Sequence, residues 1–346
     1  MATVHRDAPL ALFWACMLLG VHPIVQISAV SADAAAGTDY ATTKQSADDF
    51  LQNLDLDWTV LRPSLVYGQG SYGGTSFLRG LAGLPLVIPV IGDGRQAFTP
   101  IHVEDLAAAI LMAVEGRLRR VTLAPCGPET LTFAEIVQRT RAWLDLPPAR
   151  LLHVPLPLVK LIARLGDVLR LGPVNSTALR QLEFGNAAEP ATFAHMVEFA
   201  PRSMAEAFAS TPSHVQDRWH ARLYFLKPAT TAALALTWFA SGAIGLLAPA
   251  ATAAAATNGL GFPSTAAPAL SIGACLLDLA FALSVCAAPP WRTAALAITQ
   301  AAVVIVYTLA LTIAQPALWA DPYGPLLKNL AVLALIGLWA ALRDER

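Results

Sequence analysis

Two residues with complementary acid–base chemistry lie four positions apart in the run Tyr40-Ala-Thr-Thr-Lys44. Residues at this spacing share one face of a helix, so the two side chains point the same way. A lysine cation beside a phenol favours the phenolate, and we therefore expect Lys44 to lower the pKa of Tyr40 from about 10. Such a tyrosine can give or take a proton near neutral pH. The pair alone is common by chance and does not identify an enzyme.

The segment before this helix predicts a buried strand that ends in a hydroxyl. It reads Pro23-Ile-Val-Gln-Ile-Ser28, and a serine at its end can hold a substrate carbonyl. The apolar run 10–20 before the strand imitates the core of a signal peptide. We favour a helix instead, because Gly20 stops the run and a strand follows directly.

Strand and helix patterns alternate around these residues. We expect strands at 24–30, 58–63 and 120–124, and helices at 40–54, 104–114 and 133–144. Thr132 and Glu135 have the spacing of a capping box for the last helix. Near-continuous apolar strands alternating with helices indicate a parallel sheet covered by helices. The predicted fold class is α/β for residues 1–150, followed by a helical substrate or linker region at 151–221.

Charge is distributed unevenly along the chain. Hydrophobic residues make up 55% of the sequence and charged residues 14%, against about 25% charged in soluble domains. From 228 through 277, fifty residues carry no charge. A helix that spans a bilayer needs about 20 apolar residues. We therefore expect an all-α transmembrane bundle in residues 222–346, with four spans at about 229–248, 266–288, 293–314 and 324–342.

The charges that flank these segments predict an orientation. Arg218, Arg222 and Lys227 precede the first segment, Arg292 separates the second from the third, and Arg343 and Arg346 follow the fourth. Positive residues favour the cytoplasmic side. We therefore expect a multi-pass protein of an inner or plasma membrane with both termini in the cytoplasm. The soluble part would lie on that face.

Asp278 falls inside the second predicted span. An ionisable residue at this depth is costly and suggests a functional site. We expect Lys328 as its partner, or Arg292 if Asp278 lies near the cytoplasmic end. A purely structural pair inside the bundle is the alternative reading.

Two classes of function are disfavoured by composition. The formal net charge is −1 and no basic block dominates, so nucleic acid is not an expected partner. The four cysteines form no C-x-x-C pair, which argues against a disulfide framework or a zinc site. We predict no metal centre.

A set of motifs in the first half of the chain has a recognisable order and spacing. The runs are Val25 to Asp33, Asp39-Tyr-Ala-Thr-Thr-Lys44, Trp58-Thr-Val-Leu-Arg-Pro-Ser-Leu-Val-Tyr-Gly68 and Ile91 to Ala107. Together they resemble the extended, atypical branch of the short-chain dehydrogenase/reductase superfamily. The nearest relatives would be proteins similar to the mitochondrial complex I accessory subunit of this fold.

The resemblance implies a role for each matching residue. Tyr40 matches the catalytic tyrosine, Lys44 the lysine that also binds the cofactor ribose, and Ser28 the catalytic serine, with Ser31 a weaker match. The segment that would line the nicotinamide consists of Pro63, Ser64, Leu65 and Val66. The implied cofactor is NAD or NADP.

Two further residues match the superfamily in a supporting role. His102 and Asp105 correspond to a recurring motif that the resemblance makes structural. We expect this motif to cap and fix the helix that follows it.

The chain departs from the superfamily in one respect. Relatives begin with a strand and a glycine-rich turn that holds the cofactor pyrophosphate. No such turn precedes Ser28, and only 27 residues come before it. Gly68, Gly70, Gly73 and Gly74 follow a late strand and cannot replace that turn. Either the true start of the protein lies upstream of Met1, or the chain is a degenerate enzyme.

The second half of the chain resembles the DoxX-like membrane family. The residues that carry this resemblance are Tyr224-Phe-Leu-Lys-Pro228 and Asp321-Pro-Tyr-Gly-Pro-Leu-Leu-Lys-Asn329. Three functions follow as hypotheses. The chain could be a membrane-anchored oxidoreductase that uses a quinone or another apolar substrate from the bilayer. It could be a non-catalytic assembly protein of a membrane complex. In the third, the bundle carries the activity through Asp278 and Lys328.

Overall fold

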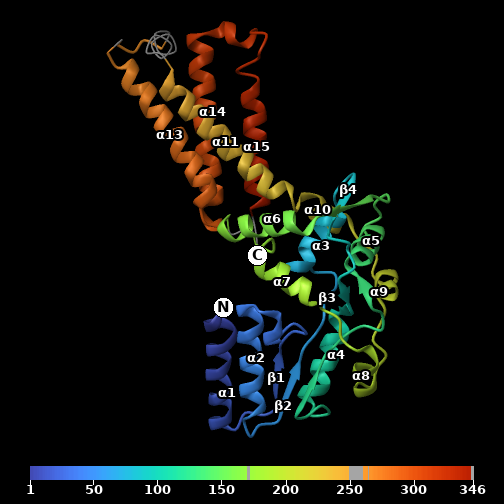
Figure 1. The fold of residues 1–346 in the computed structure, drawn as a ribbon. Coiled ribbons are helices and arrows are strands. Elements are labelled where there is room, and N and C mark those ends of the chain that lie inside the picture. Colours follow the sequence, from blue (N-terminus) through green and yellow to red (C-terminus); the bar gives the residue numbers. More distant parts are fainter. Residues whose placement is uncertain (170–171, 249–259, 264, 344–346) are drawn as a thin grey trace. The chain divides into compact units, whose positions relative to one another are not determined.

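The computed structural model describes residues 1–169, 172–248, 260–263 and 265–343. They divide into two compact units, Met1–Arg222 and Leu223–Arg346 (Figure 1). Each unit has its own hydrophobic core, and each is considered separately below.

The first unit opens with a helix, a turn and a strand. A π-helical turn, η1 (Thr3–Asp7), leads into α1 (Ala8–Leu19), which ends at Gly20 in the left-handed conformation at φ 65°. β1 (Ile24–Ile27) follows, so the predicted helix and strand are confirmed. The 3₁₀ turn η2 (Ala34–Ala36) precedes α2 (Asp39–Gln52), where the Thr38 side chain caps the helix by accepting from the Ala41 amide.

A parallel sheet forms the centre of this unit, as the strand pattern predicted. β2 (Trp58–Leu61) lies between β1 and β7 (Val121–Leu123), and both pairings are parallel. Alternate residues of β2 point to opposite faces. Val60 packs with Phe13 and Leu51 of α1 and α2, and Leu61 packs with α4 (Val103–Val114). Figure 1 shows α1 and α2 on one side of the strands and α4 on the other.

Shorter strands extend the first unit beyond this sheet. β3 (Val66–Tyr67) pairs with β6 (Ile101–His102), and β5 (Ala97–Phe98) pairs with β8 (Leu131–Thr132). β4 (Val87–Ile91) pairs in parallel with β9 (Arg150–Val154). β3 and β9 are not among the strands expected from the sequence. The helices here are α3 (Gly74–Ala82) and α5 (Phe133–Trp143), and α5 has the predicted capping box.

Residues 155–222 are helical and belong to the same unit. They form α6 (Leu156–Leu169), α7 (Ser176–Phe184), α8 (Pro190–Met196), α9 (Met204–Ser210) and α10 (Val215–Leu223). These helices agree with the helical region expected at 151–221, in which positions 170–171 lie outside the described residues. Ion pairs fix this region to the sheet region: Arg79 contacts Asp217 at 3.0 Å and Arg202 contacts Asp105 at 2.9 Å.

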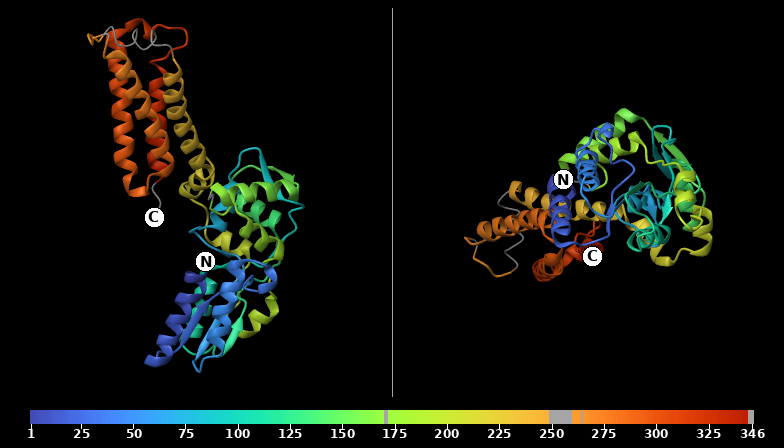
Figure 2. Two further views of the ribbon diagram at one scale, coloured as in Figure 1. Left: turned by 60° about the vertical axis from the view of Figure 1, so that its left-hand side comes forward. Right: turned by 90° about the horizontal axis from the view of Figure 1, so that it is seen from below.

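The second unit is a helical bundle whose helices run side by side (Figure 2). Among the described residues, three helices are long and apolar enough to cross a membrane. They are α11 (Leu226–Leu247), α13 (Ala267–Ala287) and the stretch Pro290–Ala314, which joins η3 (Pro290–Arg292) to α14 (Thr293–Ala314). A short turn, η4 (Pro316–Trp319), follows. Positions 249–259 and 264, in the predicted connector, and Arg346 lie outside the described residues.

The predicted fourth span is shorter than expected. α15 (Lys328–Leu342) has 15 residues, about 22 Å at 1.5 Å per residue, whereas the hydrocarbon core of a bilayer is about 30 Å thick. The expected helix began at 324, but residues 322–327 form turns instead. α15 still contributes to the core of the bundle through the buried Ile336 and Trp339.

Glycines let α11 and α13 approach closely. A Cβ atom at Gly242 would lie 2.6 Å from the Cys275 carbonyl oxygen, and one at Gly245 would lie 2.4 Å from the Cys275 sulfur. Small residues at helix contacts are the usual means by which membrane helices pack tightly. This contact places Ser241 of α11 beside Asp278 of α13.

Candidate active site

The structure brings Tyr40 and Lys44 together on the first turns of α2. The Lys44 ammonium lies 5.6 Å from the centre of the Tyr40 ring. It also donates a hydrogen bond of 3.2 Å to the Ile27 carbonyl at the end of β1. The His5 ring packs edge-on against Tyr40 with 5.3 Å between centroids, a contact that sequence reasoning missed. The predicted pair therefore exists, and the segment before α1 covers part of it.

The electrostatics of this pair differ from the expectation. Burial raises the pKa of Tyr40, and no opposing effect outweighs it. Burial also lowers the pKa of Lys44, partly offset by Asp48. The prediction that Lys44 lowers the Tyr40 pKa was therefore wrong for this conformation, because the ammonium is directed to a backbone carbonyl and the phenol is desolvated. Tyr40 is a phenol that keeps its proton at neutral pH.

Ser28 lies directly after β1, and its surroundings are polar. The side chain is buried, and its oxygen has no partner that meets full hydrogen-bond geometry among the described residues. It nevertheless interacts with the carboxyl group of Asp48. Asp48 is completely buried and accepts from Arg62 at 2.8 Å. Ser28 thus lies beside the ion pair that Asp48 of α2 forms with Arg62. Ser31 is buried as well.

The segment 63–66 is held by its own hydrogen bonds. The Val30 amide donates to the Pro63 carbonyl at 3.1 Å, and the Ile101 amide donates to the Leu65 carbonyl at 2.9 Å. The Ser64 hydroxyl donates to the Asn186 carbonyl and accepts from the Thr99 amide. Pro63 and Ser64 are buried, whereas Leu65 and Val66 are partly exposed. Leu65 and Val66 are the members of the predicted cofactor-lining set that offer surface.

The two residues expected to fix the following helix do so. His102 precedes α4, and its Nδ1 accepts from the Glu104 amide at 3.4 Å. Asp105 is buried and accepts from both the Arg202 amide and the Arg202 guanidinium, each at 2.9 Å. The motif therefore ties α4 to the loop before α9.

The glycine-rich loop before α3 contacts a cation, the Arg79 guanidinium, through backbone carbonyl groups. The Arg79 guanidinium donates to the carbonyls of Gly68 and Gln69, each at 3.0 Å. A pyrophosphate cradle needs backbone N–H groups directed at the ligand. This loop directs carbonyl oxygens inward, which agrees with the expectation that it cannot replace a phosphate-binding turn.

A separate polar site lies inside the bundle. Asp278 is 4% exposed, and its Oδ2 accepts from the Ser241 hydroxyl at 2.6 Å. Its Oδ1 has no partner among the described residues, and neither does the buried hydroxyl of Tyr307, which interacts electrostatically with Asp278. The predicted partners were wrong: in the described part of the bundle neither Lys328 nor Arg292 pairs with Asp278. Lys328 begins α15, and Arg292 lies against the Trp291 ring.

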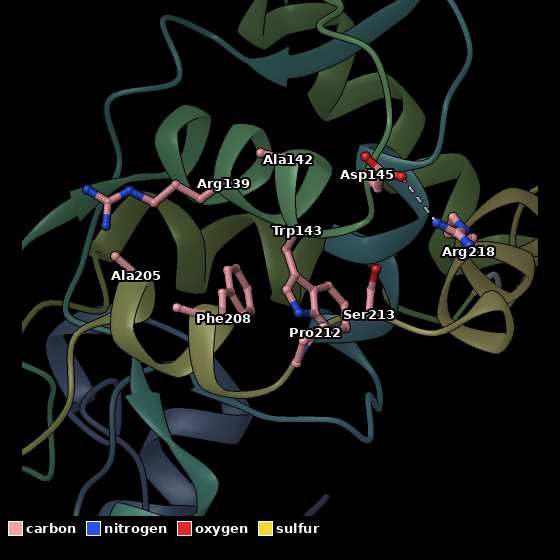
Figure 3. A pocket seen from close by; sticks show the side chains of 10 residues that line it. Arg139, Ala142, Trp143, Asp145, Ala205, Phe208, Pro212, Ser213 and Arg218 are labelled. Atoms are coloured by element: carbon pink, nitrogen blue, oxygen red, sulfur yellow. Dashed lines mark ion pairs between the residues drawn. The ribbon is translucent and has the colours of Figure 1, made fainter.

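Sequence reasoning also missed an open surface pocket of about 560 Å³ in the first unit (Figure 3). Its aromatic wall is Trp143 of α5, stacked on Phe208 of α9 with centroids 5.0 Å apart. Arg218 and Asp145 pair at 3.5 Å at its rim. None of the predicted catalytic residues lines it. The lining residues come from 139–145 and 205–218, so no short motif could have indicated the pocket.

Comparison with known proteins finds a matching family for a segment in each half of the chain. Residues 20–121 match the NAD dependent epimerase/dehydratase family, and residues 235–337 match the DoxX-like family. A curated relative is subunit 9 of the NADH dehydrogenase [ubiquinone] 1 alpha subcomplex of Arabidopsis thaliana mitochondria. It is 26% identical over 153 residues, which cover 42% of this chain and 36% of the relative. The chain thus spans about a third of that protein's length.

Solved structures resemble the first unit distantly. The epimerase Mth375 of Methanothermobacter thermautotrophicus has a TM-score of 0.47 and 16% identity over 64% of this chain and 66% of its own. The UDP-glucuronic acid 4-epimerase of Bacillus cereus has a TM-score of 0.43 and 14% identity, covering 64% and 68%.

The two family matches fall on the two structural units. The segment with the parallel sheet is the one of epimerase/dehydratase type, and the segment with the apolar helices is the DoxX-like one. The predicted fusion is confirmed: this chain joins a short-chain-dehydrogenase-type, Rossmann-like segment to a DoxX-like membrane segment.

Proposed function

We propose that the chain is the membrane-anchored part of an NAD(P)-dependent oxidoreductase of the short-chain dehydrogenase type. The observation that supports this most is the shared face of Tyr40 and Lys44 on α2, next to the end of β1. In this proposal residues 1–150 form the partial cofactor-binding domain, 151–221 the substrate or linker region, and 222–346 the membrane domain.

The residues present fit one end of the cofactor. Lys44 and Tyr40 would hold the nicotinamide ribose, and Leu65 and Val66 would lie against the ring. Among the described residues we find no glycine-rich turn for the pyrophosphate, so the proposal assigns residues to the nicotinamide end alone. NAD(P)H, when bound, supplies a hydride to a carbonyl carbon. The cofactor could be NAD or NADP.

The proton chemistry follows from the state of Tyr40. Because burial raises its pKa, Tyr40 holds a proton at neutral pH and would donate it to the carbonyl oxygen as the carbon is reduced. The ammonium of Lys44 would stabilise the phenolate that remains. Ser28 could turn its hydroxyl from Asp48 toward the carbonyl oxygen. The product is the alcohol, which for a quinone substrate tautomerises to the hydroquinone.

The membrane domain suggests where the substrate comes from. A reductase tethered to a bilayer can receive an apolar carbonyl compound, such as a quinone, without release into water. The positive residues around the spans support a cytoplasmic location for this unit and for both termini. The inner or plasma membrane is the compartment we propose.

The test uses the full-length native protein in lipid nanodiscs with NADH, NADPH and a short-chain benzoquinone as the probe. We expect Lys44→Ala to weaken cofactor binding at least about tenfold, the loss of roughly one charge-assisted hydrogen bond. Tyr40→Phe should retain binding and lose turnover. Tyr72→Phe changes a largely exposed tyrosine and serves as the control. Turnover that survives Tyr40→Phe would overturn the assignment.

A non-catalytic role in a membrane complex is the second candidate. The 26% identity with a segment of the plant NADH dehydrogenase subunit supports it. It predicts a membrane complex that persists in the Tyr40→Phe, Lys44→Ala double variant. Failure of the native protein to bind either NADH or NADPH would favour it.

A third candidate rests on the bundle. Asp278 has an unpartnered oxygen buried between helices, with the unpartnered Tyr307 hydroxyl nearby. Intramembrane carboxyl groups of this kind often mark a functional site. Asp278→Asn would then abolish activity while Tyr40→Phe would not. Lys328→Ala, which removes the other predicted residue, should have no such effect because Lys328 does not reach Asp278.

A further inference from the structure

Helix α6 carries an unusual exposed face. Five of its apolar side chains are between 43% and 79% exposed: Leu158, Leu161, Ile162, Leu165 and Val168. Their spacings of three and four place them on one side of the helix. A stripe of this kind in a surface helix normally faces the core of its own domain, but here it faces outward.

The rotation of α6 is fixed by its opposite side. Ala163 is buried, and a Cβ atom added to Gly166 would lie 1.7 Å from the Val174 carbonyl oxygen. The backbone at 174 therefore packs directly on the helix at this point. α6 cannot turn its apolar stripe inward without breaking this contact.

Polar side chains occupy the remaining flank. Lys160, Arg164 and Asp167 follow one another at spacings of four and three. Lys160 reaches Glu183 at 3.5 Å, and Asp167 accepts from the Ser176 amide at 3.0 Å. α6 thus has a packed side, a polar side and an exposed apolar side. Basic residues beside an apolar stripe are typical of helices that lie in the headgroup region of a bilayer.

The covalent chain keeps the end of α10 close to the membrane. Two residues, Tyr224 and Phe225, separate the end of α10 at Leu223 from the start of α11 at Leu226. Even fully extended, this link spans about 10 Å. Trp219 of α10 is 60% exposed, and tryptophan is enriched at the level of lipid headgroups.

Contacts within the first unit place α6 at the same end as α10. A Cβ atom at Gly83, just after α3, would lie 2.6 Å from the Ala221 backbone of α10. α3 leads into β4, β4 pairs with β9, and β9 runs directly into α6. Figures 1 and 2 show α6, β4 and α10 grouped at one end of this unit.

We propose that α6 is an interfacial helix whose exposed apolar stripe inserts into the headgroup region of the bilayer that the spans cross. Arg164 and Lys160 then lie at the level of the lipid phosphates, and the first unit is held against the membrane at two places, α6 and the link to α11. The proposal rests on the membrane spans and not on the oxidoreductase activity.

The test labels single cysteines with the environment-sensitive fluorophore NBD. The full-length protein carries Cys16→Ser and Cys286→Ser, because these two thiols are partly or fully exposed whereas Cys126 and Cys275 are buried. Leu161→Cys and Leu165→Cys report on the apolar stripe, and Arg164→Cys on the polar flank is the matched control. Each variant is reconstituted in nanodiscs of phosphatidylcholine and phosphatidylglycerol, with and without lipids that carry a doxyl quencher.

We expect blue-shifted emission at positions 161 and 165 and quenching by doxyl lipids severalfold stronger than at 164. Emission at 161 and 165 like that of the probe in water would overturn the proposal. A blue shift without quenching would also overturn it, because a protein surface, such as a second copy of this chain, would then cover the stripe. Circular dichroism of the three variants confirms that each is folded.

Discussion

Asp48 and Asp278 are buried aspartates in different units, and their surroundings differ. Asp48 is completely buried in the first unit and Asp278 is 4% exposed in the second. Each has one carboxylate oxygen in a hydrogen bond and one without a full partner. Asp48 is paired with the Arg62 guanidinium and lies near Lys44. The corresponding hydrogen-bond partner of Asp278 is the hydroxyl of Ser241.

The difference shows how each unit compensates a buried acid. Burial of a charge is tolerated when a counter-ion is near, and breaking such a pair leaves the second charge uncompensated. The first unit follows this rule with Arg62. The bundle uses a hydroxyl, which compensates a neutral carboxylic acid well and a carboxylate poorly. Asp48 therefore has a counter-ion that offsets part of the cost of its burial, whereas Asp278 has a hydrogen bond to a neutral hydroxyl.

The largest expected effect is at the ion pair. Asp48→Ala leaves Arg62, which is 25% exposed, without its partner. We expect the first unit to lose about 3 kcal/mol of stability, measured by hydrogen exchange of the β1 and β2 amides in the full-length protein. Asp49→Ala on the exposed side of α2 is the control. A loss below about 1 kcal/mol would mean that water solvates Arg62 well enough to replace Asp48. The proposed difference between the two aspartates would then be wrong.

The second largest expected effect is a difference in stability loss between Ser241→Ala and Ser28→Ala. Ser241→Ala removes the hydrogen bond to Asp278 and should destabilise the bundle by about 2 kcal/mol, because a buried polar group loses its partner. Ser28→Ala should cost the first unit less than about 1 kcal/mol, because Arg62 still holds Asp48. Unfolding in mixed detergent micelles measures the first change, and hydrogen exchange the second.

The control for the bundle is Thr237→Val on the same helix. The Thr237 hydroxyl is exposed and bonds back to the Ala233 carbonyl of its own helix. Equal losses for Ser28→Ala and Ser241→Ala would show that the arginine gives no protection. The proposed distinction between the two acids would then be wrong.

The comparison also shows what sequence could predict. The strand at 24–27 and the helix at 39–52 were predictable because apolar periodicity and the capping residue Thr38 are local signals. The pairing of Tyr40 with Lys44 followed from helix geometry. β9 was missed because its partner β4 is about 60 residues away, and pairing at that distance leaves no local pattern.

The predictions that were wrong concern properties that tertiary contacts determine. The Tyr40 pKa depends on burial by neighbours, including His5, that the motif does not contain. Lys328 was a reasonable partner for Asp278 by charge alone, but the rotation of each helix and the depth of each residue decide which side chains meet. The glycines that bring Ser241 to Asp278 could not be matched to a partner without the structure.

The smallest expected effect is a pH dependence at Asp48. Burial raises the pKa of this carboxyl above its usual value of 3.8, and Ser28, Arg62 and Lys44 offset only part of that rise. A carboxyl group whose folded pKa is raised binds its proton more tightly in the folded state. Its contribution is therefore present below the unfolded pKa and is lost as the pH rises through the folded pKa.

The measurement compares the native protein with Asp48→Asn across pH 3 to 8, using hydrogen exchange or thermal unfolding of the first unit. Glu135 and Glu206, whose pKa values are lowered by capping hydrogen bonds, have the opposite pH dependence but are present in both proteins and cancel in the difference. We expect the native protein to lose stability relative to the variant as the pH rises above about 4, and the difference to become constant once Asp48 is ionised. A difference that grows in favour of the native protein over the same range would mean that the Arg62 pair outweighs burial, and that the charge at Asp48 is fully compensated.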